Sequence, residues 1–137
     1  MIVYFYKNQL DYFRRKARST NNEIYACLVG KHCGGSSTTV YSIEYPPLEL
    51  SAPSIVKTDP QGLEEIESDA MSQGLSIVGN IHSHPNAVTR LSPHDHKHLF
   101  VDKEKIVGVV GIVGRRTFVD FWRQDSSLPC TVEYIRE

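Results

Sequence analysis

Hydrophobic positions follow two different periods along the chain. Short β-branched and aromatic runs predict strands, while apolar residues spaced by three and four predict amphipathic helices. Strands are predicted over residues 2–6, 23–29, 37–45, 75–82, 106–113, 117–122 and 131–135. Helices are predicted over residues 8–19 and 59–74, and a short third helix over 93–100. We expect the strand over 106–113 to be central, because it is strongly β-forming throughout.

Glycine, proline and capping residues set the boundaries of these elements. Asn8 is the expected N-cap of the first helix, and Asp59-Pro60 begins the second, which Gly74 ends. Gly30 is expected to close the second strand, and Gly34-Gly35 to turn it into a hairpin with the third. The fold class is α/β: a mixed, mainly antiparallel sheet of about six or seven strands, flanked by two or three helices.

Composition indicates one ordinary globular domain over residues 1–137. The chain is 40% apolar and 23% charged, which excludes a disordered chain and a fibre. No apolar run approaches the roughly 20 residues of a membrane span, so we expect no membrane partner. The net charge of −1 argues against a nucleic-acid partner, and 137 residues are too few for a (β/α)8 barrel.

The chain has three cysteines, Cys27, Cys33 and Cys130. This number is small and odd, which argues against a disulfide framework. The first apolar stretch, residues 1–6, is short and follows no basic region, so we expect no signal peptide and a cytoplasmic location. Catalysis by cysteine is disfavoured, since Cys27 lies mid-strand and reads as a small buried hydrophobe.

Five of the six histidines lie between residues 82 and 98. His82 and His84 stand two apart at the end of a predicted strand, so both project from the same face. Asp95 follows eleven residues after His84. A loop of that length can fold back and bring the Asp95 carboxylate to the two histidines. Two imidazoles and one carboxylate suit Zn²⁺, and three protein ligands leave one position open, as in catalytic sites.

The other histidines of this segment compete as ligands. His94 and His96 fall two apart on the predicted short helix, so they face apart and are expected to be solvated. His98 can share a helix face with Asp95 and is the reserve ligand. An isolated H-x-H pair is more often a surface or core pair than a ligand set, so the spacing of the further residues matters.

That spacing resembles a known signature. His82-x-His84, seven residues, Ser92, two residues and Asp95 are similar to the H-x-H-x(7)-S-x(2)-D motif of the JAMM (MPN+) zinc metalloproteases. The segment from Glu23 to Gly30 resembles the family's upstream glutamate strand, with alanine at position 26 where the family often has glycine. The resemblance covers residues 1–122 and implies a cytidine-deaminase-like MPN fold of the minimal prokaryotic type.

The resemblance implies a role for each matching residue. His82, His84 and Asp95 would bind one zinc ion, and Glu23 would act as general base for a zinc-activated water. Ser92 would donate a hydrogen bond to the developing oxyanion, although a helix N-cap is its alternative role. The alternative for Glu23 is a solvated residue at the start of a strand.

The resemblance also implies an enzyme: a zinc-dependent isopeptidase or peptidase that cleaves after the C-terminal glycine tail of a ubiquitin-like protein. One alternative substrate is a sulfur-carrier protein whose C-terminus is trimmed. A non-catalytic MPN scaffold and a DNA-repair-associated relative are further alternatives. The basic run over 14–16 could be a partner surface, but a solvated helix face is the simpler interpretation.

Overall fold

The computed structural model describes residues 1–51, 56–85, 106–123 and 129–135 of the chain. The predicted short helix over 93–100 lies outside these residues, as do Ser92 and Asp95. Within the described part, no helix has the length and apolar character needed to cross a membrane.

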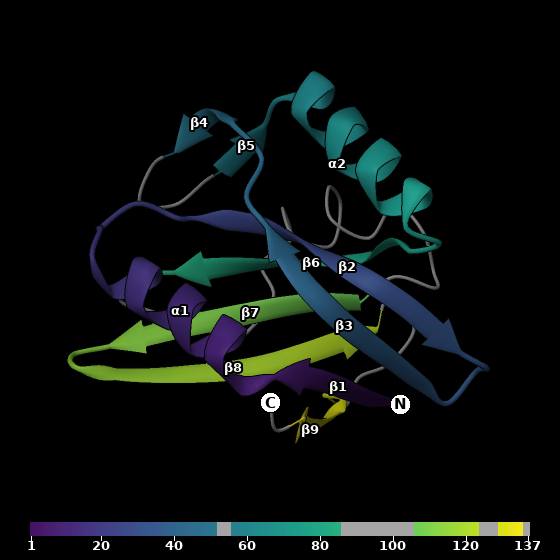
Figure 1. Ribbon diagram of the computed structural model, residues 1–137. Helices are drawn as coiled ribbons and strands as arrows, with labels where there is room; N and C mark the ends of the chain where they lie inside the picture. Colours follow the sequence, from purple (N-terminus) through teal and green to yellow (C-terminus); the bar gives the residue numbers. More distant parts are fainter. Residues whose placement is uncertain (52–55, 86–105, 124–128, 136–137) are drawn as a thin grey trace.

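A seven-stranded sheet forms the body of the molecule, in the order β8-β7-β6-β2-β3-β1-β9 (Figure 1). Its strands are β1 (Ile2–Tyr6), β2 (Tyr25–Cys33), β3 (Ser37–Glu44), β6 (Ser76–His84), β7 (Ile106–Val113), β8 (Arg116–Arg123) and β9 (Thr131–Ile135). The strands β4 (Leu48–Ser51) and β5 (Val56–Thr58) form a separate antiparallel pair, which the sequence did not predict. Among the described residues, four of the seven strand pairings are antiparallel. The mixed, mainly antiparallel α/β class is therefore confirmed.

Helix α1 (Lys7–Arg18) packs its apolar face against the sheet, as the periodicity predicts. Leu10, Phe13 and Ala17 are buried in the main core. The predicted N-cap at Asn8 is wrong, because the helix begins at Lys7 and Tyr6 takes the cap position without a side-chain cap hydrogen bond. The last residue of β1 thus leads directly into the helix, and no polar cap residue separates the two elements.

Arg14 joins α1 to β8. Its guanidinium donates to the hydroxyl of Thr117 at 2.8 Å and to the carbonyl of the same residue at 3.3 Å. The interpretation of residues 14–16 as a solvated helix face is therefore wrong for Arg14, because its side chain extends from α1 to the sheet.

Helix α2 (Pro60–Ser72) begins where predicted. The Asp59 side chain caps it by accepting from the backbone N–H of Gln61 at 3.3 Å. Its buried residues are Gly62 and Ala70, whereas Met71, which the pattern placed on the apolar face, is exposed. Met71 follows Ala70 by one residue, about 100° around the helix, so it turns away from the sheet.

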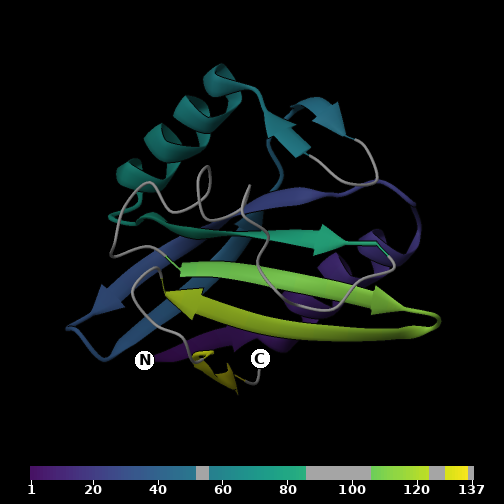
Figure 2. The same ribbon diagram turned by 180° about the vertical axis from the view of Figure 1, so that it is seen from behind.

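Two further expectations about the strands are wrong. Strand β2 does not end at Gly30 but continues to Cys33, and Gly30 sits where a side chain would meet the Thr39 carbonyl of β3. Strand β7 is second from the edge rather than central. It is apolar because both its faces are covered: Ile106 and Val110 join the main core, while Val109 packs in a second cluster. Figure 2 shows β6, β7 and β8 side by side from behind.

Candidate metal centre

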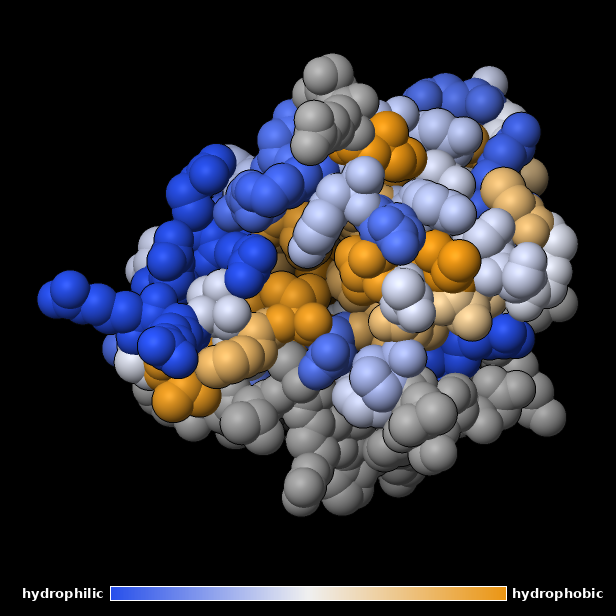
Figure 3. Space-filling model, turned by 90° about the horizontal axis from the view of Figure 1, so that it is seen from below, coloured by the Kyte–Doolittle hydropathy of each residue, from blue (hydrophilic) through white to orange (hydrophobic). Residues whose placement is uncertain are grey.

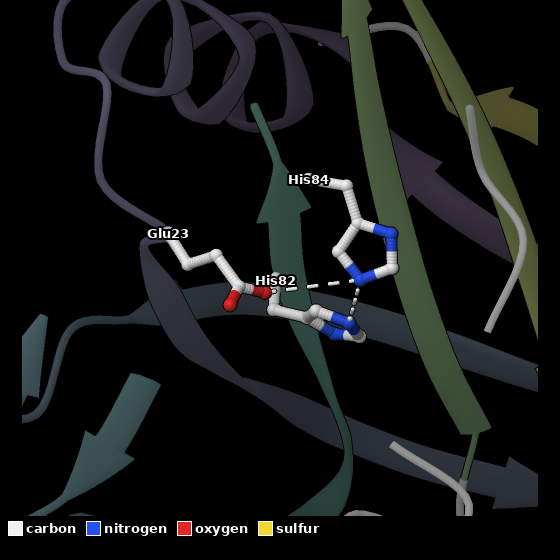
Figure 4. Close-up of side chains that lie close together, drawn as sticks. All are labelled: Glu23, His82 and His84. Carbon is white, nitrogen blue, oxygen red and sulfur yellow. Dashed lines mark hydrogen bonds and ion pairs between the residues drawn. The ribbon is translucent and has the colours of Figure 1, made fainter. Parts of the chain in front are cut away.

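The end of β6 presents two imidazoles to one point. The Nε2 atoms of His82 and His84 lie 3.1 Å apart, and the two rings meet edge to face (Figure 4). His82 is fully buried, whereas His84, the last residue of the strand, is partly accessible. The predicted placement of both side chains on one strand face accounts for this convergence, because residues two apart on a strand point the same way.

Glu23 joins the two histidines from a different part of the chain. It lies two residues before β2, and its Oε1 is 3.8 Å from Nε2 of His84. Only 4% of Glu23 is exposed, so the alternative interpretation as a solvated strand-start residue is wrong. A buried carboxylate is costly unless charged or polar groups face it, which makes this placement chemically informative.

Ser83 lies between the two histidines and holds Glu23 in place by bonding to Ile24, the residue that follows Glu23. The backbone N–H of Ile24 donates to the Ser83 hydroxyl at 2.9 Å, and the backbone N–H of Ser83 donates to the Ile24 carbonyl at 3.0 Å. Sequence reasoning missed this residue. The available signal was a small hydroxyl side chain between two candidate ligands, on the opposite face of the strand, where it can bond to backbone.

Tyr25 lies opposite His82 on the neighbouring strand. It is the cross-strand partner of His82 in the antiparallel pairing of β2 with β6. Burial raises the pKa of the Tyr25 phenol well above its ordinary value, and Cys27 adds to this. The phenol therefore stays neutral and protonated near pH 7. Tyr25 is therefore not a proton acceptor near pH 7, whereas the Glu23 carboxylate can accept a proton.

The donor set fits a metal ion. One ligand atom each from Glu23, His82 and His84 lies within 4.8 Å of the others. Two ligands of a tetrahedral zinc ion, each at about 2.0–2.1 Å, stand roughly 3.3–3.4 Å apart. The 3.1 Å between the two Nε2 atoms is close to that spacing. An N–H···N hydrogen bond between two imidazole tautomers has a similar length, so the geometry permits a metal without requiring one.

The remaining predicted site residues are not placed by the structure. Ser92, Asp95 and the competing histidines His94, His96 and His98 all lie outside the described residues. Their roles stay predictions from the sequence. None of the three cysteines forms a disulfide: Cys27 is buried, Cys33 is exposed and Cys130 is partly buried.

Comparison with known proteins identifies the family. Residues 7–125 match the prokaryotic homologs of the JAB domain, and the chain belongs to this JAB/MPN family. The family membership and the fold agree with the resemblance seen in the sequence. No curated protein sequence matches the chain significantly.

Solved structures of other proteins share the fold. A solution structure of a protein from Desulfitobacterium hafniense is similar with a TM-score of 0.82 and 21% identity, covering 100% of this chain and 94% of that one. A solution structure of a protein from Salinibacter ruber is similar with a TM-score of 0.65 and 19% identity, covering 100% and 92%. At these identities the likeness concerns the fold alone.

Proposed function

We propose that this protein is a zinc-dependent isopeptidase or peptidase that cleaves after the C-terminal glycine tail of a ubiquitin-like protein. The observation that carries the proposal is the convergence of a buried carboxylate, Glu23, with the paired Nε2 atoms of His82 and His84. Membership in the JAB/MPN family supports a peptidase site at this position. A sulfur-carrier protein with a similar tail is the alternative substrate.

Each residue has a distinct task in this proposal. His82 and His84, with Asp95, would hold the zinc ion, which supplies a Lewis acid that lowers the pKa of water and polarises the carbonyl. Glu23 takes a proton from the attacking water and delivers it to the leaving amine as the C–N bond breaks. Ser92 donates a hydrogen bond to the carbonyl oxygen as negative charge develops on it.

Access to the site favours an extended tail of small residues. His82 is fully buried, whereas His84 at the end of β6 is partly accessible, so a substrate must approach from the His84 side. An extended chain passes through a narrow approach more readily than a folded surface does. Small side chains beside the cleaved carbonyl leave room for Glu23 and the two imidazoles.

Removal of the two histidines tests the metal assignment. The wild-type protein is expected to retain about one zinc ion per chain after dialysis, and the His82→Ala, His84→Ala double variant close to none. Elemental analysis by mass spectrometry measures the ratio. His32→Ala is the control, because His32 bonds to Thr38 near the far end of β2. Equal zinc in the double variant and the wild type would remove the basis for the site.

Loss of the Ser83 hydroxyl should lower turnover without releasing zinc. The Ser83→Ala variant removes the acceptor of the Ile24 N–H but keeps both histidines, so Glu23 loses one of its two tethers. We expect kcat to fall roughly 10-fold, since small displacements of a reacting group are costly. Ser37→Ala, which removes a hydroxyl bonded to the Cys33 carbonyl away from the site, is expected to leave kcat unchanged.

The substrate is tested with ubiquitin-like fusions that carry a short C-terminal extension, with products read by mass spectrometry. Cleavage after the glycine that a chelator abolishes is the expected result. Equal cleavage of unrelated unfolded chains would show a general peptidase, and no cleavage of any substrate by the zinc-loaded protein would favour a non-catalytic scaffold.

A further inference from the structure

The two helices carry opposite charge. Helix α1 has five basic residues and one acidic residue, a net charge of +4, and helix α2 has four acidic residues and no basic residue, a net charge of −4. The whole chain has a net charge of only −1. The near-neutral total therefore conceals two strongly and oppositely charged surfaces.

The exposed side of α1 is an ordered surface of aromatic and cationic groups. Tyr12 is 48% exposed and Tyr45 37%, and their rings meet edge to face with centroids 6.0 Å apart. The Lys16 ammonium lies 5.1 Å from the Tyr45 centroid and 5.5 Å from that of Tyr12, while the Arg15 guanidinium lies over Tyr12. We name Tyr12, Arg15, Lys16 and Tyr45 the tyrosine–lysine surface.

Seen from below, hydrophilic side chains gather on the side of the molecule where α1 and the β7–β8 turn lie (Figure 3). Tyrosine and arginine are the residue types enriched where proteins bind one another, and here cation–π contacts hold them in place before binding. This arrangement lowers the ordering cost of binding.

The exposed side of α2 has the complementary character. Glu64, Glu67 and Met71 follow one another by three and four residues, so they line one face of the helix. Met71 is 67% exposed, more than the other large hydrophobic residues exposed in the described part of the chain. We name these three residues the glutamate–methionine surface: an apolar, flexible side chain beside two carboxylates.

We propose that the tyrosine–lysine surface of one copy of this chain binds the glutamate–methionine surface of a second copy. The carboxylates meet Lys16 and Arg15, and the Met71 thioether packs against the tyrosine rings, a favourable sulfur–aromatic contact. Within one chain the two helices lie apart: in Figure 1 α1 is at the lower left and α2 at the upper right, and Figure 2 shows the same separation from behind. Only another copy can bring these two surfaces together.

This contact joins two different surfaces of the chain, so the symmetry of the assembly decides how often it occurs in each pair of copies. It can be reciprocal in a closed dimer or repeat in a longer assembly, and in either case each chain uses both helices. The charges are exposed, so the association should weaken as the ionic strength rises. The proposal does not depend on the proposed function, because it involves neither the site residues nor a metal.

Charge exchange between the two surfaces tests the proposal by analytical ultracentrifugation at low ionic strength. The wild type is expected to associate with increasing concentration and to become monomeric in high salt. Arg15→Glu, Lys16→Glu should be monomeric, because both of its surfaces then carry carboxylates, which repel those of another copy. Glu64→Lys, Glu67→Lys should be monomeric because both of its surfaces then carry basic side chains, which repel those of another copy. An equimolar mixture of the two variants should associate again, since each supplies the charge that the other lacks.

A matched control changes the same charge on another face of α2. In Glu65→Lys, Asp69→Lys, two exposed carboxylates about 100–140° around the helix from Glu64 are reversed, and this variant is expected to associate like the wild type. Circular dichroism establishes that each variant is folded. A wild type that stays monomeric at high concentration and low salt overturns the proposal, as does equal loss of association in both α2 variants.

Discussion

Glu23→Gln is expected to lower the cleavage rate by roughly 10²-fold or more while leaving zinc content and stability close to wild type. Glutamine keeps the size and polarity of the side chain at the position 3.8 Å from His84 but cannot accept the proton from water. The decrease should appear in kcat, because the loss concerns the reaction rather than substrate binding. Steady-state kinetics on a glycine-tailed fusion, with zinc measured in the same samples, provides the test.

Glu44→Gln is the matched control. Glu44 is exposed at the end of β3, and its substitution is expected to leave kcat within about twofold of wild type. The zinc measurement separates two roles for Glu23. Loss of zinc in Glu23→Gln would make Glu23 a ligand instead of a base, whereas full activity would show that the proton goes elsewhere.

Gly79→Ala is expected to destabilise the protein by about 3 kcal/mol. A Cβ at position 79 would lie 2.0 Å from the Ile106 carbonyl oxygen and 2.8 Å from its Cγ1. Both belong to the neighbouring strand β7, which pairs with β6 from this point onward. The backbone oxygen cannot move aside as the end of a flexible side chain could, so the two strands must separate locally. Urea denaturation measures the change in midpoint.

Gly35→Ala is the control for this second substitution. A Cβ at position 35 would have no neighbour within 4 Å, and the expected change in stability is within about 0.5 kcal/mol. Zinc retention should also fall in Gly79→Ala, since His82 and His84 lie further along the same strand. Equal unfolding midpoints for both variants would show that the strand pairing tolerates the added methyl group.

The sequence by itself determined the main strands and helices and the pairing of His82 with His84. The β-branched runs and the three-and-four spacing predicted the seven strands of the main sheet and both described helices, because these periods reflect which side of each element is buried. The i, i+2 spacing placed His82 and His84 on one face for the same reason. Gly34, Gly74 and Gly114 end or turn their elements with a positive φ, a backbone conformation that glycine adopts readily.

Other features depended on contacts that no local pattern encodes. Gly62 packs closely against Pro47, and Met71, nine residues further along α2, faces outward on the opposite side of the helix. Gly30 stands inside a strand because the Thr39 backbone crosses close beside it. The place of β7 near the edge depends on which strands pair in the sheet. Its apolar sequence indicates only that both of its faces are covered.

The decisive contribution of the tertiary structure is the position of Glu23. The family resemblance implied its role, but residue spacing alone could not bring it to the histidines. The hydrogen bonds between Ile24 and Ser83, residues 59 positions apart, bring the start of β2 to the end of β6 and bury the carboxylate there. Sequence periodicity reports the face on which a side chain lies, whereas the distance between remote segments is set by the hydrogen bonds and packing that join them.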